Sequence, residues 1–440
     1  MVACLASTKP EETTMPDHRK LGRELGLFGS DPLIGAGLPY LLPDGAAVRH
    51  VLEEYVREVE RRAGYRHVYS PVLGKRELYE LSGHWAHYRD DMFPPMDVGG
   101  EQVVLRPSLC PHHALIYRSR ARSHRELPLR LAELGGMYRA ELSGVLGGLG
   151  RVRAIQLNDA HIFCTPDQLG AEVRAALELI RRGYADLGLK AARYRLSLPD
   201  DRGKYAGAAD EWDRAAEVLA DALDGVEYER GPGEAAFYGP KIDVQIADSA
   251  GRESTLSTVQ IDHYQPEQFG LEYIGADGRA HRPVLVHRSL LGSLERVLAQ
   301  LVEEYGGAFP PWLAPVQVVV LPVGDADFPA AAAVVEQCLD AGLRAEIVPA
   351  EKGSLGARIR DHRLVPYQAV VGAREADAGL VAPRLRDGTK LDPLPVKEFI
   401  AKVARSRATH VRKPPPPRQP GPSRRVSRTR AADASSPWPR

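Results

Sequence analysis

The chain has 440 residues, of which 44% are hydrophobic and 26% charged, a composition typical of soluble globular proteins. This length accommodates two or three domains, each with its own core. The 58 basic and 58 acidic residues cancel, which excludes a uniformly positive body and requires local basic patches for any nucleic-acid partner.

Cysteine usage and the start of the chain bear on the compartment. Widely spaced cysteines exclude a dense disulfide framework and are typical of a reducing compartment. The first residues have no basic segment followed by a long apolar core, and no later run approaches about eighteen apolar residues. We therefore expect a cytoplasmic protein with no membrane partner and a flexible tail at residues 1–16. The four cysteines are Cys4, Cys110, Cys164 and Cys338.

A long helix is expected after a short charged segment at residues 17–28 and a loop at residues 35–42. Asp44 is the expected N-cap, and apolar residues recur at helical spacing as far as Arg62. Gly64 ends this helix, and residues 67–73 are expected to form a strand. Pro71 removes a ladder donor from that strand, which is typical of an edge strand or an interface.

Two segments with histidine or cysteine follow. His84 and Trp85 lie in LSGHWAHYRDDMF, where packing is an equally good explanation for both residues. Cys110 lies in LRPSLCPHHALIY, and no CxxC or HxxxH motif is nearby. A lone cysteine is more often a small buried apolar residue than a metal ligand.

Residues 137–164 hold the densest grouping of functional residue types. Arg139 and Glu141 are expected on a strand-like run, which is followed by a glycine-dense turn and a second strand over residues 154–164. Alternation along the second strand places Asp159 and His161 on one face. The arginine suits a phosphate, and the aspartate and histidine suit an amine, a hydroxyl or a metal. The alternative is an ordinary ribbon with a solvated ion pair.

The middle of the chain predicts further helices and strands. Residues 165–233 contain two amphipathic helices without a catalytic grouping, and residues 235–248 and 254–263 predict two strands. Tyr238 lies in the first strand and Gln260 in the second; judged without relatives, Tyr238 is a half-buried aromatic with its hydroxyl in water. Residues 282–305 predict a strand with His287, a turn at Gly292 and a helix with Arg296 beside its apolar stripe.

The C-terminal part has a different pattern. After residue 312, strands and helices alternate, which predicts a parallel sheet with covering helices. Arg374, Glu375 and Arg384 are expected in loops, where solvated charges are the alternative to a binding role. Residues 405–440 are rich in Arg, Pro and Ser and form either a loose RNA-binding arm or a simple disordered extension.

Several of these segments resemble the threonyl-tRNA synthetases, which are class II aminoacyl-tRNA synthetases. YRAELSG, GRVR and NDAHIFC, within residues 137–164, resemble motif 2 of that class. The helix and strand at residues 45–73 resemble motif 1, and residues 282–305 resemble motif 3. Because the resemblance extends from about residue 17 to about residue 403 and contains several separate motifs, chance is a poor explanation.

The resemblance implies an α+β fold with two domains. A class II catalytic domain, an antiparallel sheet with helices, is expected at residues 17–312, with residues 165–233 as an insertion. A small α/β anticodon-binding domain is expected at residues 313–404. Motif 1 implies a homodimer interface, and the implied partners are ATP, L-threonine and threonine tRNA.

The implied reaction joins threonine to ATP as threonyl-adenylate and then passes the acyl group to the 3′ end of threonine tRNA. Arg139 and Arg296 would hold phosphates, Arg151 is a further phosphate candidate, and Glu141 would meet the adenine edge. Mg²⁺ would bridge the phosphates of ATP. His84 is a candidate for proton transfer from the terminal ribose of the tRNA. The implied anticodon-binding residues are Arg374, Glu375 and Arg384.

The resemblance also implies one zinc ion per subunit, held by Cys110, His161 and His287. Three protein ligands leave positions open for the substrate amine and hydroxyl, so that valine lacks one ligand. The implied threonine-binding residues are Asp159, Tyr238 and Gln260.

Serine shares the amine and the hydroxyl, and loss of one methyl group costs only about 1 to 3 kcal/mol. Because the resemblance begins near residue 17, the editing domain of full-length relatives is expected to be absent. We therefore expect measurable serine mischarging in cis, and the sequence leaves open whether serine is edited in trans.

Five departures from the family wording lie in or near the expected pocket and indicate an altered site, as in a second copy that evades an inhibitor of the housekeeping enzyme. The alternative is a paralogue that adenylates an amino acid for a non-tRNA acceptor or binds tRNA without catalysis. The intact arginines and metal ligands argue against a non-catalytic regulator, and the anticodon-type domain argues against a non-tRNA acceptor. The departures are Leu109, His112, Gly147, Leu157 and Thr255.

Overall fold

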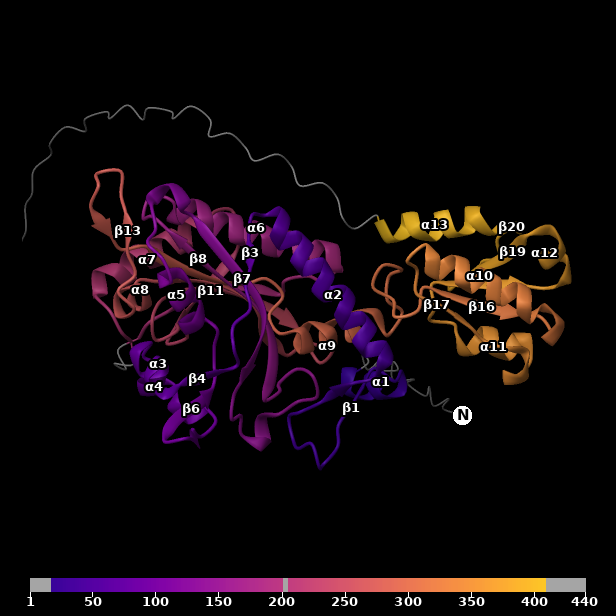
Figure 1. Cartoon of the computed structure of the whole chain (residues 1–440), viewed down its shortest axis with the longest axis horizontal. Helices are drawn as coiled ribbons and strands as arrows, with labels where there is room; N and C mark the ends of the chain where they lie inside the picture. Colours follow the sequence, from indigo (N-terminus) through magenta and orange to yellow (C-terminus); the bar gives the residue numbers. More distant parts are fainter. Residues whose placement is uncertain (1–16, 201–204, 409–440) are drawn as a thin grey trace, which may run out of the picture.

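The computed structural model describes residues 17–200 and 205–408, so that the tail expected at residues 1–16 lies outside the described part. Two units follow one another along the chain (Figure 1). The N-terminal unit is built on an eight-stranded sheet and the C-terminal unit on a five-stranded sheet. Each unit has its own cluster of buried apolar residues, as a chain of this length requires.

The main sheet of the N-terminal unit has the strand order β10-β9-β11-β12-β15-β8-β7-β3. Neighbouring strands are antiparallel, except for the pairs at its two edges, β10 with β9 and β3 with β7. This confirms the expected antiparallel sheet with helices. The strands are β3 (Arg66–His67), β7 (Leu129–Tyr138), β8 (Ala154–Cys164), β9 (Arg193–Leu198), β10 (Tyr228–Pro232), β11 (Lys241–Ala247), β12 (Glu253–Asp262) and β15 (Val284–Ser289).

Helices cover one face of this sheet. The helices α6 (Leu169–Leu187), α7 (Ala209–Ala222) and α9 (Leu294–Tyr305) contact its strands, and α2 (Pro43–Arg62) contacts α9. Val48, Leu52 and Val56 share one side of α2 and are fully buried, each contributing about 1.5–3 kcal/mol of apolar burial. On β8, Ala160 and Ile162 belong to this core. Alternation therefore directs their odd-numbered neighbours to the opposite face.

The opposite face is covered by α5 (Cys110–Arg118), whose Ala114 and Tyr117 pack against Leu131 and Phe163 of the sheet. A three-stranded sheet, β4-β6-β5, lies in the same part of the chain. The remaining elements of this unit are α1 (His18–Glu24), β1 (Phe28–Gly29), β2 (Tyr40–Leu41), β4 (Leu73–Lys75), α3 (Arg76–Leu81), α4 (His84–His87), η1 (Arg89–Asp91), β5 (Met96–Val98), β6 (Glu101–Leu105), η2 (His124–Glu126), η3 (Ser143–Val145), α8 (Tyr264–Gln268), β13 (Tyr273–Ile274) and β14 (Ala280–His281).

The C-terminal unit has a mixed sheet of order β17-β16-β18-β19-β20. The three strands expected from the sequence are parallel, as predicted, and β19 and β20, which the sequence analysis did not predict, are added antiparallel. Its elements are β16 (Val318–Pro322), η4 (Asp325–Asp327), α10 (Phe328–Asp340), β17 (Ala345–Ile347), η5 (Ala350–Lys352), α11 (Leu355–Asp361), β18 (Tyr367–Val371), α12 (Ala373–Ala378), β19 (Leu380–Leu385), β20 (Leu394–Pro395) and α13 (Val396–Ala408).

Several expected boundaries need correction. The N-cap of α2 is Leu42, with Pro43 in the first turn, because proline there gives up no hydrogen bond; Asp44 lies inside the helix. The strand expected at residues 67–73 is limited to β3, and Pro71 lies in the gap before β4. Segment 165–233 supplies two strands of the main sheet, β9 and β10. Helix α13 continues through residue 405, and the rest of the expected tail after residue 408 lies outside the described residues.

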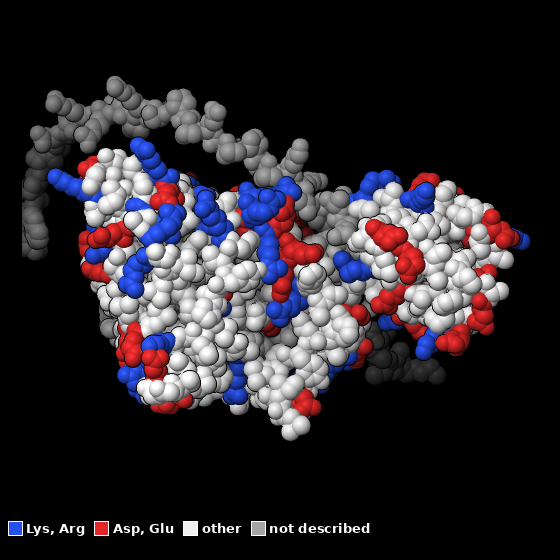
Figure 2. Space-filling view, in the orientation of Figure 1, with Lys and Arg blue, Asp and Glu red and all other residues white. Residues whose placement is uncertain are grey.

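Charge is distributed over both units. On the face shown in Figure 2, basic and acidic side chains are interspersed, and wide uncharged areas lie between them. The sequence contains equal numbers of basic and acidic residues. Within residues 17–200 and 205–408, no helix is both long and apolar enough to span a membrane.

Candidate active site

A cavity of about 300 Å³ opens on the sheet face opposite the helices. Its lining joins the segments that sequence analysis had treated separately: the start of α5, the motif 2 hairpin, β11 and β12, β15, and the start of α9. Of the residues expected in the site, it contains Cys110, Arg139, Glu141, Arg151, Asp159, His161, Tyr238, Gln260, His287 and Arg296.

Two histidines and a cysteine meet at the inner end of this cavity. His161 on β8 and His287 on β15 are register partners, and their Nε2 and Nδ1 atoms are 3.0 Å apart. One ligand atom each from Cys110, His161 and His287 lies within 4.8 Å of the others, and all three residues are buried. A thiol with two imidazoles is a donor set typical of zinc.

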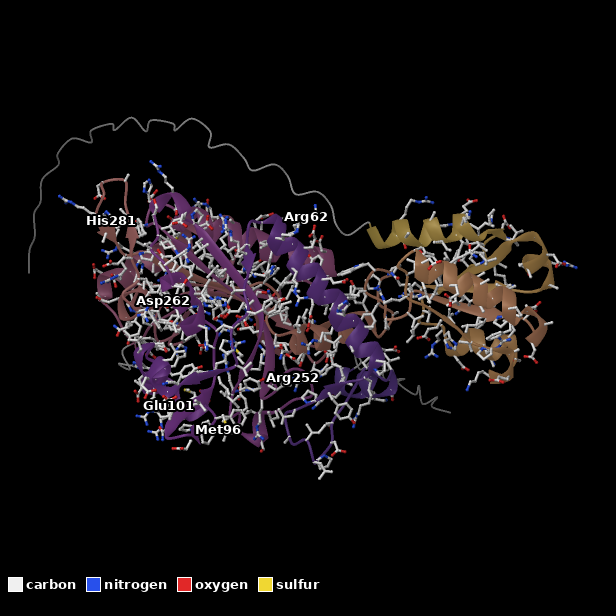
Figure 3. The ribbon with its side chains drawn as sticks, viewed as in Figure 1. Arg62, Met96, Glu101, Arg252, Asp262 and His281 are labelled. Carbon is white, nitrogen blue, oxygen red and sulfur yellow. The ribbon has the colours of Figure 1, made fainter. Side chains whose placement is uncertain are left out.

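Hydrogen bonds behind the two histidines determine where their protons lie. His287 Nε2 is 2.8 Å from an oxygen of the buried Asp262, whose position inside the N-terminal unit is labelled in Figure 3. His161 Nδ1 is 2.8 Å from His113 Nδ1, and His113 Nε2 is 3.1 Å from Glu133. Because an ionised carboxylate only accepts, the outward nitrogens of neutral imidazoles carry the protons along both chains.

The inward nitrogens of His161 and His287 then face one another as two lone pairs. Burial, and after it the nearby His113 and His287, lowers the pKa of His161 well below 6.5, which favours the neutral ring. The network therefore needs one further cation between the rings, and the Cys110 sulfur beside them suits a metal ion. The residues present fit zinc, with Glu133 and Asp262 as the orienting carboxylates behind the ligands.

Glu133 is firmly held as an anion. Burial alone would raise its pKa, but hydrogen bonds from His113 and Ser70 and the charge of Arg106 lower it to about 2. Arg106 Nη2 lies 3.0 Å from Glu133. Burial raises the pKa of the Cys110 thiol to about 12, so the thiolate requires a neighbouring cation.

A small polar compartment adjoins the cluster. Asp159 lies on the same face of β8 as His161, as alternation predicted, and its carboxylate is 3.8 Å from His161 Nε2. Burial raises the pKa of Asp159. The Tyr238 hydroxyl donates to Gln260 Oε1 at 2.9 Å, and its ring stacks on that of His287 at 4.7 Å between centroids. Tyr238 precedes β11 instead of lying within a strand.

The other end of the cavity is positively charged. Arg139 and Glu141 follow the end of β7 at Tyr138, so their expected place on the strand was wrong; they lie in the loop that lines the cavity. Arg139 Nε is buried without a hydrogen-bond partner among the described residues. Arg296 donates to the Gly150 carbonyl at 3.0 Å, and burial, followed by Arg139 and Arg151, lowers its pKa. Three guanidiniums opposed by one carboxylate suit a multivalent anion.

Arg151 and Glu141 form an ion pair at 2.8 Å, and the Arg151 side chain is half exposed. This pair therefore lies at the mouth of the cavity, where a planar ligand can reach both groups.

His84 lies beside this cavity in an adjoining space of about 450 Å³, which is also lined by Arg139 and Tyr238. Its Nδ1 is 2.9 Å from Ser82 Oγ, and its Nε2 is 2.9 Å from Ser108 Oγ. Burial lowers its pKa to about 3. Its expected part in proton transfer remains a prediction.

The expected anticodon residues lie in the C-terminal unit, apart from the cavity. Arg374 and Glu375 are in α12 and Arg384 is on β19, so none lies in a loop. Glu375 accepts from the Gly372 backbone at 3.0 Å and caps its own helix, which is a structural task. Their contact with RNA remains a prediction.

Sequence analysis did not predict three residues that lie behind the cluster of Cys110, His161 and His287: His113, Glu133 and Asp262. A partial signal was present, because Glu133 lies between Ala132 and Leu134 on β7, and a carboxylate buried among apolar neighbours requires a partner. Which partner it has depends on contacts across the sheet, which local sequence does not reveal.

Comparison with known families defines the class first. Residues 93–305 match the model of the tRNA synthetase class II core domain (G, H, P, S and T), and residues 317–406 match the anticodon binding domain. Both domains of a class II aminoacyl-tRNA synthetase are thus present.

Comparison with individual relatives identifies the family within this class. The chain is 48% identical over 402 residues to the threonine–tRNA ligase of Halalkalibacterium halodurans and 48% identical over 400 residues to threonine–tRNA ligase 1 of Bacillus subtilis. These matches cover 90% and 89% of this chain but 62% of each relative, so the chain spans less than two thirds of their length.

A solved structure matches more completely. The RNA binding domain of threonyl-tRNA synthetase from Cryptosporidium parvum superposes with a TM-score of 0.84 at 34% identity, covering 89% of this chain and 98% of that one. A putative threonyl-tRNA synthetase from Aeropyrum pernix gives a TM-score of 0.78 at 26% identity. The chain belongs to the threonyl-tRNA synthetase family.

Proposed function

We propose that this protein is a threonine–tRNA ligase, which activates threonine with ATP and transfers it to the 3′ end of threonine tRNA. The observation that carries the proposal is the single cavity with a Cys110, His161 and His287 cluster at one end and three arginines at the other. A ligand that fills it presents a small polar group to the cluster and a polyanion to the arginines.

The arginines account for the activation step. Attack of a carboxylate on the α-phosphate of ATP requires neutralisation and alignment of two anions, which positioned cations supply. Arg139, whose buried Nε is uncommitted, bridges the carboxylate and the α-phosphate; Arg296 and Arg151 hold the outer phosphates. Glu141 meets the adenine edge, and Mg²⁺ accompanies the nucleotide.

The cluster accounts for amino-acid selection. Cys110, His161 and His287 would hold one zinc ion per subunit, and the bound ion supplies two open coordination positions for an amine and a hydroxyl. Asp159 accepts the hydroxyl hydrogen, while Tyr238 and Gln260 line the threonine side. A site built for a hydroxyl rejects valine more strongly than an apolar pocket does.

Serine is not rejected on these grounds. It carries the same amine and hydroxyl, and one missing methyl group costs about 1 to 3 kcal/mol, or about 10- to 200-fold. We propose that this site charges serine measurably.

Assembly and location complete the proposal. Tyr69, Val72 and Leu73 follow the motif 1 helix and are 78%, 38% and 42% exposed, and burying them against a second copy would form the homodimer interface. The three described cysteines are free and buried, in keeping with the reducing cytoplasm. tRNA binds through the C-terminal unit and the cavity mouth.

Four of the five departures from the family wording line this cavity or lie near Cys110 in the sequence, whereas Gly147 does not line it. Leu157 and Thr255 line it, and both Leu109, the N-cap of α5, and His112 in α5 are buried. Replaced side chains at these positions alter the surface that an active-site inhibitor contacts. We propose that the protein is a second, inhibitor-insensitive copy of the ligase.

The test is aminoacylation of threonine tRNA with labelled threonine, serine and valine, alongside threonine-dependent ATP–pyrophosphate exchange. Threonine charging with lesser serine charging and no valine charging supports the proposal. Exchange without transfer would indicate the alternative of adenylation for a non-tRNA acceptor. Absence of both activities in zinc-loaded protein would leave the non-catalytic tRNA-binding alternative. A Cys110→Ser variant, matched with Cys338→Ser in the C-terminal core, separates loss of metal from loss of a thiol.

A further inference from the structure

The N-terminus of α1 reaches the turn that immediately precedes Arg151, one of the arginines proposed to bind phosphate. His18 lies between this turn, residues 147–150, and helix α9, and its side chain is 12% exposed. The backbone N–H of Leu149 lies 3.3 Å from His18 Nε2, and His18 Nδ1 lies 2.7 Å from Glu303 Oε1. One imidazole thus connects two segments that are far apart in the sequence.

The two contacts require one proton arrangement of the ring. A backbone N–H can only donate, so His18 Nε2 must present its lone pair, and Nδ1 must carry the proton that Glu303 accepts. Glu303 is itself held by the backbone N–H groups of His18 at 3.1 Å and Ser249 at 2.7 Å. Both ring nitrogens are therefore in use, which excludes a metal-ligand role for His18 in its grouping with Asp17 and Glu303.

The turn that His18 holds leads directly into the positive end of the cavity. Its Gly150 N–H donates to the Gly147 carbonyl at 2.8 Å, and the Gly150 carbonyl accepts from Arg296 Nε at 3.0 Å. Arg151 is the next residue and lines the cavity. A displacement of the turn would therefore move one arginine and remove a hydrogen bond from another.

The turn packs closely against side chains of α1. Gly148 has a φ of +53°, and a Cβ at this position would lie 2.6 Å from His18 Nε2 and 2.6 Å from Arg19 Cγ. Leu149 is fully buried. The turn is therefore seated against α1 by close contact as well as by the hydrogen bond.

We propose that His18 is a positioning residue for ATP binding, which holds residues 147–150 against α9 so that Arg151 and Arg296 present their guanidiniums to the phosphates. This inference rests on the proposed function. It is specific to one atom: the acceptor at Nε2 matters for ATP, whereas the donor at Nδ1 anchors the ring to α9.

Two substitutions separate these atoms. In His18→Asn the amide nitrogen takes the place of Nδ1 and still donates to Glu303, but nothing reaches Leu149. In His18→Gln the longer side chain places its carbonyl oxygen where Nε2 accepted. We expect the KM for ATP to rise about 3- to 10-fold in His18→Asn, the loss of one hydrogen bond, and less than about twofold in His18→Gln, with the KM for threonine unchanged in both.

The matched control is His50→Asn. His50 is an exposed histidine on α2 that pairs with Glu54 at 3.3 Å, and we expect no change in either KM. Equal KM values for ATP in the two His18 variants, or a parallel rise for ATP and threonine, would overturn the inference. Thermal unfolding of each variant identifies general destabilisation, which would lower both substrates' binding together.

Direct calorimetric titration of ATP into the same variants separates this inference from the proposed function. If the unaltered protein shows no threonine-dependent exchange, the proposed function fails, while weaker ATP binding by His18→Asn than by His18→Gln still supports the positioning role. If exchange is normal and ATP binds all variants equally, the His18 inference alone fails.

Discussion

The two ends of the cavity are built in opposite ways. At the end proposed for the amino acid, His161, His287 and Tyr238 each have a buried or partly buried partner that determines the direction of their hydrogen bonds. At the phosphate end, Arg139 has an uncommitted buried Nε and Arg151 is half exposed. The end proposed to select the amino acid is thus preformed, whereas the end proposed to bind a polyanion keeps its donors available.

We expect the largest effect on activity from a substitution at the phosphate end of the cavity. Arg139→Ala removes the group placed between the two reacting anions, and we expect kcat of threonine-dependent pyrophosphate exchange to fall about 10²- to 10³-fold. Arg89→Ala is the matched control, because Arg89 lies over the Trp85 ring and does not line the cavity. Near-normal exchange by Arg139→Ala would show that this arginine is not at the reacting centre.

Acid should lower the stability of the folded protein through Glu133, which lies behind the amino-acid end of the cavity. The folded pKa of Glu133 is about 2 against an ordinary 4.5, so the folded state binds fewer protons than the unfolded state as pH falls. Its contribution, about 3 kcal/mol, is present above pH 4.5 and is lost toward pH 2. Urea unfolding of metal-free protein through this range should show falling stability, with a shallower slope for Glu133→Gln. Equal slopes would contradict the assignment.

A more selective change keeps the three proposed zinc ligands and removes the residue behind one of them. His113→Leu leaves the Nδ1 proton of His161 without an acceptor, and we expect zinc affinity to fall about 10- to 100-fold. Competition with a chelator measures the affinity, and the absorption of cobalt-loaded protein reports the ligand geometry. His281→Leu, at an exposed histidine that pairs with Asp277, should bind zinc normally. Unchanged affinity in His113→Leu would remove this histidine from the metal site.

The smallest expected effect tests whether the two ends of the cavity act independently. Tyr238→Phe loses the hydrogen bond to Gln260 but keeps the ring stacked on His287, so about 0.5–1.5 kcal/mol is at stake. We expect the KM for threonine to rise about 2- to 10-fold while the KM for ATP stays constant. An equal change for both substrates would mean that the two ends are not independent.

Much of the fold could be predicted from local sequence patterns. The bounds of β8 and α9 follow from alternation and from the glycine and apolar stripe of motif 3, because these signals lie within one element. The prediction of one strand over residues 67–73 was wrong. The chain forms two short strands instead, β3 and β4, and Pro71 lies between them. The resemblance supplied Cys110, His161 and His287, whereas spacing alone left Cys110 as a buried apolar residue. His113 was missed because it contacts His161 from 48 residues away, and Glu133 was missed because it acts on His161 only through His113.

The register of the main sheet has a consequence for how the protein matures. Gln260, His287, His161 and Leu131 are successive partners across four strands, and the two histidines are 126 residues apart. A slip of one residue in β8 or β15 would turn a ligand to the helix-covered face. Capture of the proposed zinc ion would therefore require both strands to be in their final alignment, and ion uptake during refolding would act as a checkpoint on correct assembly of the polypeptide.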